Sequence, residues 1–220
     1  MKILQVNTSV STGSTGKITN DLGNIIIKEG NESFIAYGNM AFSSNSVLVK
    51  IGNKTDFIRH VFRSRLFDLH GFGSSRATKS FIREVESINP DIIHLHNLHG
   101  YYLNIDILFE YLKAKNKPVV WTFHDCWPFT GHCSHFEAVQ CLKWQKECYC
   151  CPNIHGYPKS WFFDNSFRNF KRKKEIFNGL SRMIIISPSE WLAKHLRNSF
   201  LSGYDILVIN NAIDIEKFNQ

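Results

Sequence analysis

Three histidines lie within six residues of this 220-residue chain, in the segment His94-Leu-His96-Asn97-Leu-His99. Imidazoles bind metals, exchange protons or hydrogen-bond a substrate. Because the segment ends an apolar run typical of a β-strand, the alternation of side chains places His94 and His96 on one face. The sequence offers no carboxylate or cysteine nearby to complete a metal site. We therefore favour hydrogen-bonding roles in a cleft for these histidines, with packing in the core as the alternative.

A second polar pair, His124 and Asp125, directly follows another apolar run. A histidine at the C-terminal end of a strand is positioned to hydrogen-bond a substrate, and near neutral pH it donates or accepts. Asp125 could orient a hydroxyl or hold the loop, and a helix cap or turn residue is the alternative for it. We take His124 as the candidate residue of a reaction cleft.

All six cysteines fall between residues 126 and 151. A C-x2-C pair followed by proline resembles a zinc knuckle, and four thiolates suit tetrahedral zinc. The remaining spacings are not those of a standard finger, so free buried cysteines and disulfides are the alternatives. We predict a closed, structural zinc site with the ligands Cys133, Cys141, Cys148 and Cys151. Cys126 and Cys150 are left outside this set.

Small residues fill the first loop, between Asn7 and Lys17. They would let the backbone approach a ligand, and the following helix would offer unpaired N–H groups to an anion. No known phosphate motif matches, because Ser11 and Ile18 stand where a P-loop needs glycine and Ser/Thr, and GxGxxG is absent. A plain connection and a phosphate or sugar contact are equal alternatives here.

The composition is that of a globular protein, with 43% hydrophobic residues and a net charge of +7. This charge favours anionic partners without choosing among them. We expect no nucleic-acid partner, because no helix-turn-helix, RNP or finger pattern is present. The sequence has no signal-peptide pattern and no apolar stretch of roughly 18 residues, so we expect a cytoplasmic protein. A reducing cytoplasm favours thiolate–metal ligation over disulfides.

Short β-branched runs alternate with amphipathic stretches along the chain. The runs predict strands at 2–7, 33–37, 47–51, 92–96, 118–123, 183–187 and 206–209. The stretches predict helices at about 17–29, 56–68, 76–88, 105–114, 166–177 and 189–198. This alternation predicts an α/β fold: a Rossmann-like parallel sheet with helices on both faces.

Two helices carry more specific expectations. Ser187-Pro188-Ser189-Glu190 is typical of a capping box, with Ser187 as the N-cap and the proline at the first helical position. In the segment from 161 to 177, Phe163, Phe167, Phe170 and Phe177 share a helical face beside basic residues. We favour a core-facing helix with a solvated basic side, and an interfacial membrane helix is the alternative.

Several segments together resemble glycosyltransferase family 4, in the branch that builds bacterial surface polysaccharides. They are MKILQVNTS…GSTGK, PDIIHLHNLHGYY, TFHDCWPFTGHC with the later cysteines, SPSEWLAKHL and INNAIDIEKF. The resemblance covers essentially the whole chain, and HDCWPFTGHC is quite specific. Enzymes of this family have the GT-B architecture, in which two Rossmann-like domains face each other across a cleft.

The resemblance implies that residues 1–209 form the N-terminal, acceptor-side domain, with a cysteine-rich insertion at about 126–159. Residues 210–220 would begin the hinge to a C-terminal domain that this sequence lacks. That domain supplies most of the nucleotide-sugar site in the family. The chain alone is therefore expected to have weak or no transferase activity.

The resemblance also implies a reaction and its residues. A sugar would pass, with retention of configuration, from a nucleotide-diphosphate sugar to a polysaccharide or lipid-linked acceptor, without a catalytic cofactor. His124 would contact the donor sugar near the reacting carbon, and His96 and Asn97 would line the acceptor side. The other substrate-binding assignments are Gly13, Thr15, Gly16, Lys17, Asp125 and Ser187.

Two further expectations follow. A lipid-linked acceptor suits transient contact between a basic, aromatic-rich face and the inner surface of the membrane. The alternative to an enzyme is a zinc-stabilised α/β module that binds a glycan or a partner without catalysis.

Overall fold

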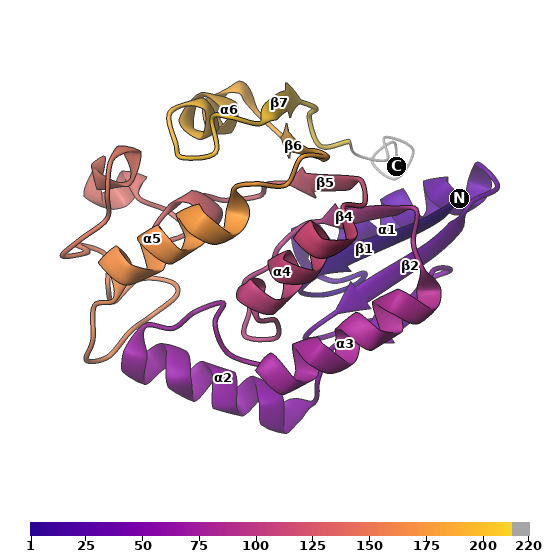
Figure 1. Cartoon of the computed structure of the whole chain (residues 1–220), viewed down its shortest axis with the longest axis horizontal. Coiled ribbons are helices and arrows are strands. Elements are labelled where there is room, and N and C mark those ends of the chain that lie inside the picture. Colours follow the sequence, from indigo (N-terminus) through magenta and orange to yellow (C-terminus); the bar gives the residue numbers. More distant parts are fainter. Residues whose placement is uncertain (213–220) are drawn as a thin grey trace, which may run out of the picture.

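The computed structural model describes residues 1–212 and contains one seven-stranded sheet (Figure 1). All neighbouring strands are parallel, in the order β3-β2-β1-β4-β5-β6-β7. The strands are β1 (Lys2–Asn7), β2 (Glu32–Tyr37), β3 (Val47–Lys50), β4 (Ile92–Leu95), β5 (Val119–Thr122), β6 (Met183–Ser187) and β7 (Asp205–Val208). The direction of winding reverses between β1 and β4, as in Rossmann-like sheets. The predicted fold class is confirmed.

Six α-helices connect the strands. They are α1 (Gly13–Lys28), α2 (Lys54–Phe67), α3 (Ser75–Ile88), α4 (Ile105–Lys115), α5 (Ser166–Phe177) and α6 (Glu190–Arg197). α1 packs on β1 and β2, whereas α3 and α4 pack on each other. Right-handed connections place α1 on one face of the sheet and α3 and α4 on the other (Figure 1).

The core lies between β5 and the helices α4 and α5. The rings of Trp121, Phe109 and Phe177 are fully buried, with centroids 4.7–5.4 Å apart. Burying aromatic rings of this size is the main source of stability at such a contact, and Phe109→Ala is expected to cost about 3–5 kcal/mol. This cluster anchors β5, the strand that leads into His124.

Most predicted elements lie within one or two residues of the observed ones, and two local predictions are wrong. α1 begins at Gly13, about four residues earlier than expected, so the predicted loop from Gly13 to Gly16 is the first turn of a helix. The predicted cap of α6 is also displaced. Ser189 is the N-cap and its hydroxyl accepts from the backbone of Leu192, while the Ser187 hydroxyl donates to the carbonyl of Ser189.

The predicted phenylalanine face of α5 is half right. Phe170 and Phe177 are buried, but Phe167 is exposed and Phe163 precedes the helix. The buried positions of α5 include polar residues instead, among them Asn169 and Lys173. Between β5 and α5 the chain runs through a long connection whose only helices are short 3-10 turns: η1 (Trp127–Phe129), η2 (Glu137–Val139) and η3 (Lys143–Gln145).

No helix in residues 1–212 is both long and apolar enough to cross a membrane. Residues 210–212 follow β7 without helix or strand. The rest of the predicted hinge, residues 213–220, lies outside the described part of the chain.

Candidate functional site

The candidate site lies where the winding of the sheet reverses. At such a point the loops that leave the carboxyl ends of adjacent strands separate, and α/β proteins bind ligands in the resulting crevice. β1 ends here at Asn7, β4 leads into His96, and β5 leads into His124. Sequence positions far apart thereby meet at one sheet edge.

Three imidazoles stack along this edge. The ring centroids of His94 and His96 are 4.1 Å apart, and those of His96 and His124 are 5.6 Å apart with planes within 15°. His96 Nδ1 lies 3.3 Å from His124 Nε2, and His94 Nε2 lies 2.8 Å from the Thr122 hydroxyl. The structure thus brings His96 and His124 into direct contact, as residues of one site.

The hydrogen bonds determine which nitrogens carry protons. The Gln5 side-chain amide donates to the carbonyl of Thr19, so its oxygen accepts from His96 Nε2 at 3.1 Å. His96 Nδ1 is then the acceptor for His124 Nε2–H. A neutral His124 is consequently left with an unprotonated Nδ1, for which no partner is found in residues 1–212.

Burial keeps these imidazoles uncharged. It lowers the pKa of His94 and of His124 to about 4, and it lowers that of His96 well below its usual value; neighbouring histidines lower the pKa of His94 and of His96 further. His124 and His94 are half-buried, whereas His96 is fully buried. A neutral imidazole with a free Nδ1 can accept a hydrogen bond from a ligand hydroxyl at pH 7.

Asp125 is bound to His99, the third histidine of the HLHNLH segment. The Asp125 Oδ2 lies 2.5 Å from His99 Nε2, and its Oδ1 accepts from the backbone N–H of Trp127 at 2.9 Å. Burial raises the pKa of Asp125, but the charge and hydrogen bond of His99 outweigh it, so the pKa is lowered. His99 Nδ1 in turn lies 3.0 Å from the Tyr157 hydroxyl. Asp125 is therefore an ionised group that holds the loop.

The β1 and β4 loops interlock through Asn7 and Thr8. Asn7 Oδ1 accepts from the backbone N–H of Asn97 at 3.3 Å, and its amide approaches the Thr15 hydroxyl at 3.5 Å. The Thr8 hydroxyl lies 3.1 Å from the carbonyl of Asn97 and 2.7 Å from that of His99. Asn97 and Thr15, both predicted site residues, are thereby tied to the same buried side chain.

The other predicted residues of this edge stand apart from the histidines. A Cβ at Gly16 would lie 3.0 Å from Ser9 Oγ and 3.2 Å from its carbonyl, so glycine lets α1 approach the first loop closely. Gly13 has φ +65° and is exposed, as is Lys17. Ser187 is buried at the end of β6 and donates within its own loop.

The sequence pointed to most of this edge but not to all of it. Gln5, which sets the proton positions, and Asn7, which joins two loops, are fully buried polar residues inside an apolar strand. A polar residue within an apolar strand is a signal that could have identified both of them as site residues. Tyr157, by contrast, lies 32 residues beyond Asp125 in an irregular segment, and no pattern connects the two.

The six cysteines are all free thiols in the long connection after β5. The four predicted zinc ligands line a common small cavity, together with His132 and Trp144. As the side chains lie, no group of three or more His, Cys, Asp or Glu in residues 1–212 is arranged to hold a metal ion. The zinc site therefore stays a prediction.

Comparison with known proteins agrees with this arrangement. Residues 41–217 match the model of Glycosyltransferase Family 4. The chain is 28% identical, over 98% of its length, to the putative colanic acid biosynthesis glycosyl transferase WcaC of Escherichia coli (strain K12). The match covers 55% of that relative, so the chain spans about half of its length. Since the family model matches well over half of the chain, this protein belongs to glycosyltransferase family 4.

Proposed function

We propose that this chain is the acceptor-side half of a retaining glycosyltransferase of the GT-B type. It would help transfer a sugar from a nucleotide-diphosphate sugar to a polysaccharide or lipid-linked acceptor. The observation that carries the proposal is the neutral, half-buried His124, whose Nδ1 has no partner within residues 1–212 while its Nε2 is committed to His96. Such a group recognises a sugar hydroxyl, which must donate a hydrogen bond to it.

His124 would position the donor sugar and would not act as a nucleophile. Its Nδ1 would accept a hydrogen bond from a hydroxyl near the reacting carbon, and the stack of His96 and Gln5 would fix the ring in one orientation. Orientation of this kind lowers the barrier because the enzyme reorganises little as the bond breaks. Asp125, the carboxylate next to His124, is not free for attack in this proposal, since it is engaged with His99.

The start of α1 is suited to the leaving diphosphate. Thr12, its N-cap, makes no side-chain capping bond, and its first turn contains no acidic residue. The first backbone N–H groups of this 16-residue helix thus remain available to an anion, reinforced by the helix dipole. Diphosphate binding would involve this turn, which contains Gly13, Thr15, Gly16 and Lys17. Asn97 would lie on the acceptor side.

We propose to test the reaction class on a longer protein in which this chain continues into a second half, matched in length to the relative. A panel of nucleotide-diphosphate sugars with a glycan or lipid-linked acceptor should give transfer with retention, seen by NMR of the anomeric proton of the product. An inverted product would overturn the retaining mechanism. Transfer that survives replacement of both His124 and Gly16 would favour a binding module over this site.

We also propose that a surface near α2 meets the membrane. The exposed rings of Phe67 and Phe163 stack with centroids 5.7 Å apart, Arg65 lies over Trp161, and Phe162 is 74% exposed. Aromatic rings beside a cation suit the interface of an anionic bilayer, and the net charge of +7 adds attraction. We call Arg65, Phe67 and residues 161–163 the aromatic surface. A lipid-linked acceptor would be reached from there.

A further inference from the structure

Four cysteines of the long connection line one small cavity. Cys133, Cys141, Cys148 and Cys151 line a cavity with a free volume of about 10 Å³, which corresponds to about one water-sized sphere. The other two cysteines, Cys126 and Cys150, do not line it. A space of this size admits a single ion and no organic ligand.

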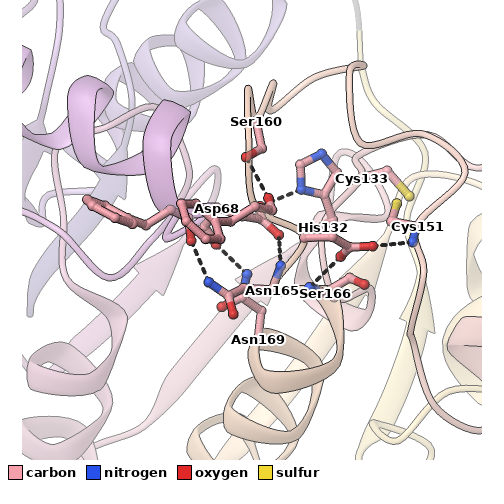
Figure 2. Close-up of polar contacts among 12 residues, drawn as sticks. Asp68, His132, Cys133, Cys151, Ser160, Asn165, Ser166 and Asn169 are labelled. Carbon is pink, nitrogen blue, oxygen red and sulfur yellow. Dashed lines mark hydrogen bonds and ion pairs between the residues drawn. The ribbon is translucent and has the colours of Figure 1, made fainter.

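Three of the four thiols are already in contact with each other or with the backbone. The thiol of Cys151 hydrogen-bonds that of Cys133, and Figure 2 shows their sulfurs next to each other. Cys148 Sγ accepts a hydrogen bond from the backbone N–H of Gly131 at 3.2 Å. Two of the four thiols thus already meet, and a third is held at the cavity wall by the backbone.

A buried lysine near the cavity forms no ion pair within residues 1–212, although Asp68 is the strongest charge that acts on it. Lys173 is 1% exposed, and its ammonium group donates to the carbonyls of Trp127 at 2.8 Å and Thr130 at 3.1 Å. It also lies near Cys133 and Cys148. An unpaired buried charge is costly. Four thiolates around Zn²⁺ carry a net charge of −2 and would compensate it.

A histidine on the same cavity wall has an unsatisfied nitrogen. His132 Nδ1 lies 2.5 Å from Asp68 Oδ1, and Asp68 is itself held by the backbone of Asn165 and the side chain of Asn169 (Figure 2). His132 Nε2 is buried and finds no partner within the described residues. A buried polar atom without a partner on this wall is consistent with an ion or a water bound in the cavity.

From these contacts we propose that the cavity binds one zinc ion through Cys133, Cys141, Cys148 and Cys151. Lys173, which lies near this cavity, compensates the charge of the centre, and His132 forms part of the cavity wall. Because no three ligating groups of residues 1–212 already meet at one point, binding draws the thiolates inward from the cavity wall. The ion would order the connection that carries Asp125 and Tyr157 to His99. The site is structural, since all four zinc positions are taken by protein.

The six cysteines supply matched variants for the test. The protein is purified without added metal, and zinc is measured by mass spectrometry. We expect about one zinc per chain, retained in Cys126→Ser and Cys150→Ser. Single Cys133→Ser, Cys141→Ser, Cys148→Ser and Cys151→Ser variants should each lose at least half of the zinc.

A spectroscopic measurement on the wild-type protein keeps the test decisive even where a cysteine variant fails to fold. Zinc is removed from the wild-type protein with a chelator and replaced by Co²⁺, which should give the intense absorption bands of a tetrahedral thiolate site. Folded protein with less than about a tenth of a zinc per chain, or cobalt without thiolate bands, would overturn the site. Equal loss of zinc in the two control variants would also overturn it. None of these readouts depends on transferase activity, so they stand apart from the proposed function.

Discussion

The proton positions of a few buried side chains determine what His124 can do. Gln5 accepts from His96 Nε2, and His96 therefore accepts from His124. Replacing Gln5 with a residue that cannot accept a hydrogen bond would remove the constraint on which nitrogens of His96 and His124 carry protons. The site thus depends on a fully buried residue behind the histidines, which is common where a buried polar network orients a functional group.

The buried histidines make stability depend on pH. In the unfolded chain His94 and His124 take up protons below about pH 6.5, whereas in the folded chain they do so only near pH 4. The unfolded state therefore binds more protons in this window, and the free energy of unfolding falls as pH is lowered from about 6.5 towards 4. At pH 5 the loss is on the order of 2 kcal/mol for each histidine.

Urea denaturation at pH 7 and pH 5 measures this loss. His94→Gln should show a smaller loss than the wild-type chain, because one of the titrating groups is gone. The control is His135→Gln, at an exposed histidine. Between pH 7 and pH 5 this variant should lose as much free energy of unfolding as the wild-type chain. A His94→Gln chain with an unchanged pH dependence would show that these pKa values are wrong.

At the level of elements, α1 must approach the first loop closely for the crevice to form. Gly16→Ala would place a Cβ 3.0 Å from Ser9 Oγ and 3.2 Å from its carbonyl. The helix or the loop must then shift, and we expect a loss of about 1–2 kcal/mol in the free energy of unfolding. Gly203→Ala, which meets nothing within 4 Å, is the control and should change it by less than about 0.5 kcal/mol. Equal effects at both positions would argue against this packing role.

The elements themselves could be predicted because buried parallel strands and amphipathic helices leave clear periodicities. β1, β6 and α5 have the bounds that their patterns predict. The start of α1 could not be predicted, since two glycines and small polar residues disfavour a helix that tertiary contact with Ser9 nevertheless stabilises. At the site, His96 and His124 could be predicted because each lies at the end of an apolar strand. The partnership of His99 with Asp125 and Tyr157 depends on the irregular connection, which has no periodicity.

At the scale of the whole molecule, the aromatic surface should bind anionic membranes. The chain is expected to sediment with phosphatidylglycerol vesicles and less with phosphatidylcholine vesicles, and high salt should weaken the binding. Phe162→Ser with Phe163→Ser should reduce binding severalfold. Phe42→Ser, at another exposed ring outside the surface, should leave it unchanged. Binding that is equal in both variants would rule out this surface.

The chain spans about half of the relative it matches. We therefore expect weak or no sugar transfer from these 220 residues alone and full transfer from the longer protein. Comparison of the two in one assay tests this. Equal turnover numbers would mean that the donor pocket is complete within this chain.

The central claim is that His124, neutral and with a free Nδ1, holds the donor sugar during transfer. The most direct test is the turnover of the longer protein carrying His124→Ala, compared with His135→Ala, which removes an exposed imidazole from the same chain. We predict a loss of about 100-fold or more for His124→Ala and near wild-type turnover for His135→Ala. A His124→Ala protein that is folded and as active as the His135→Ala protein would contradict the claim.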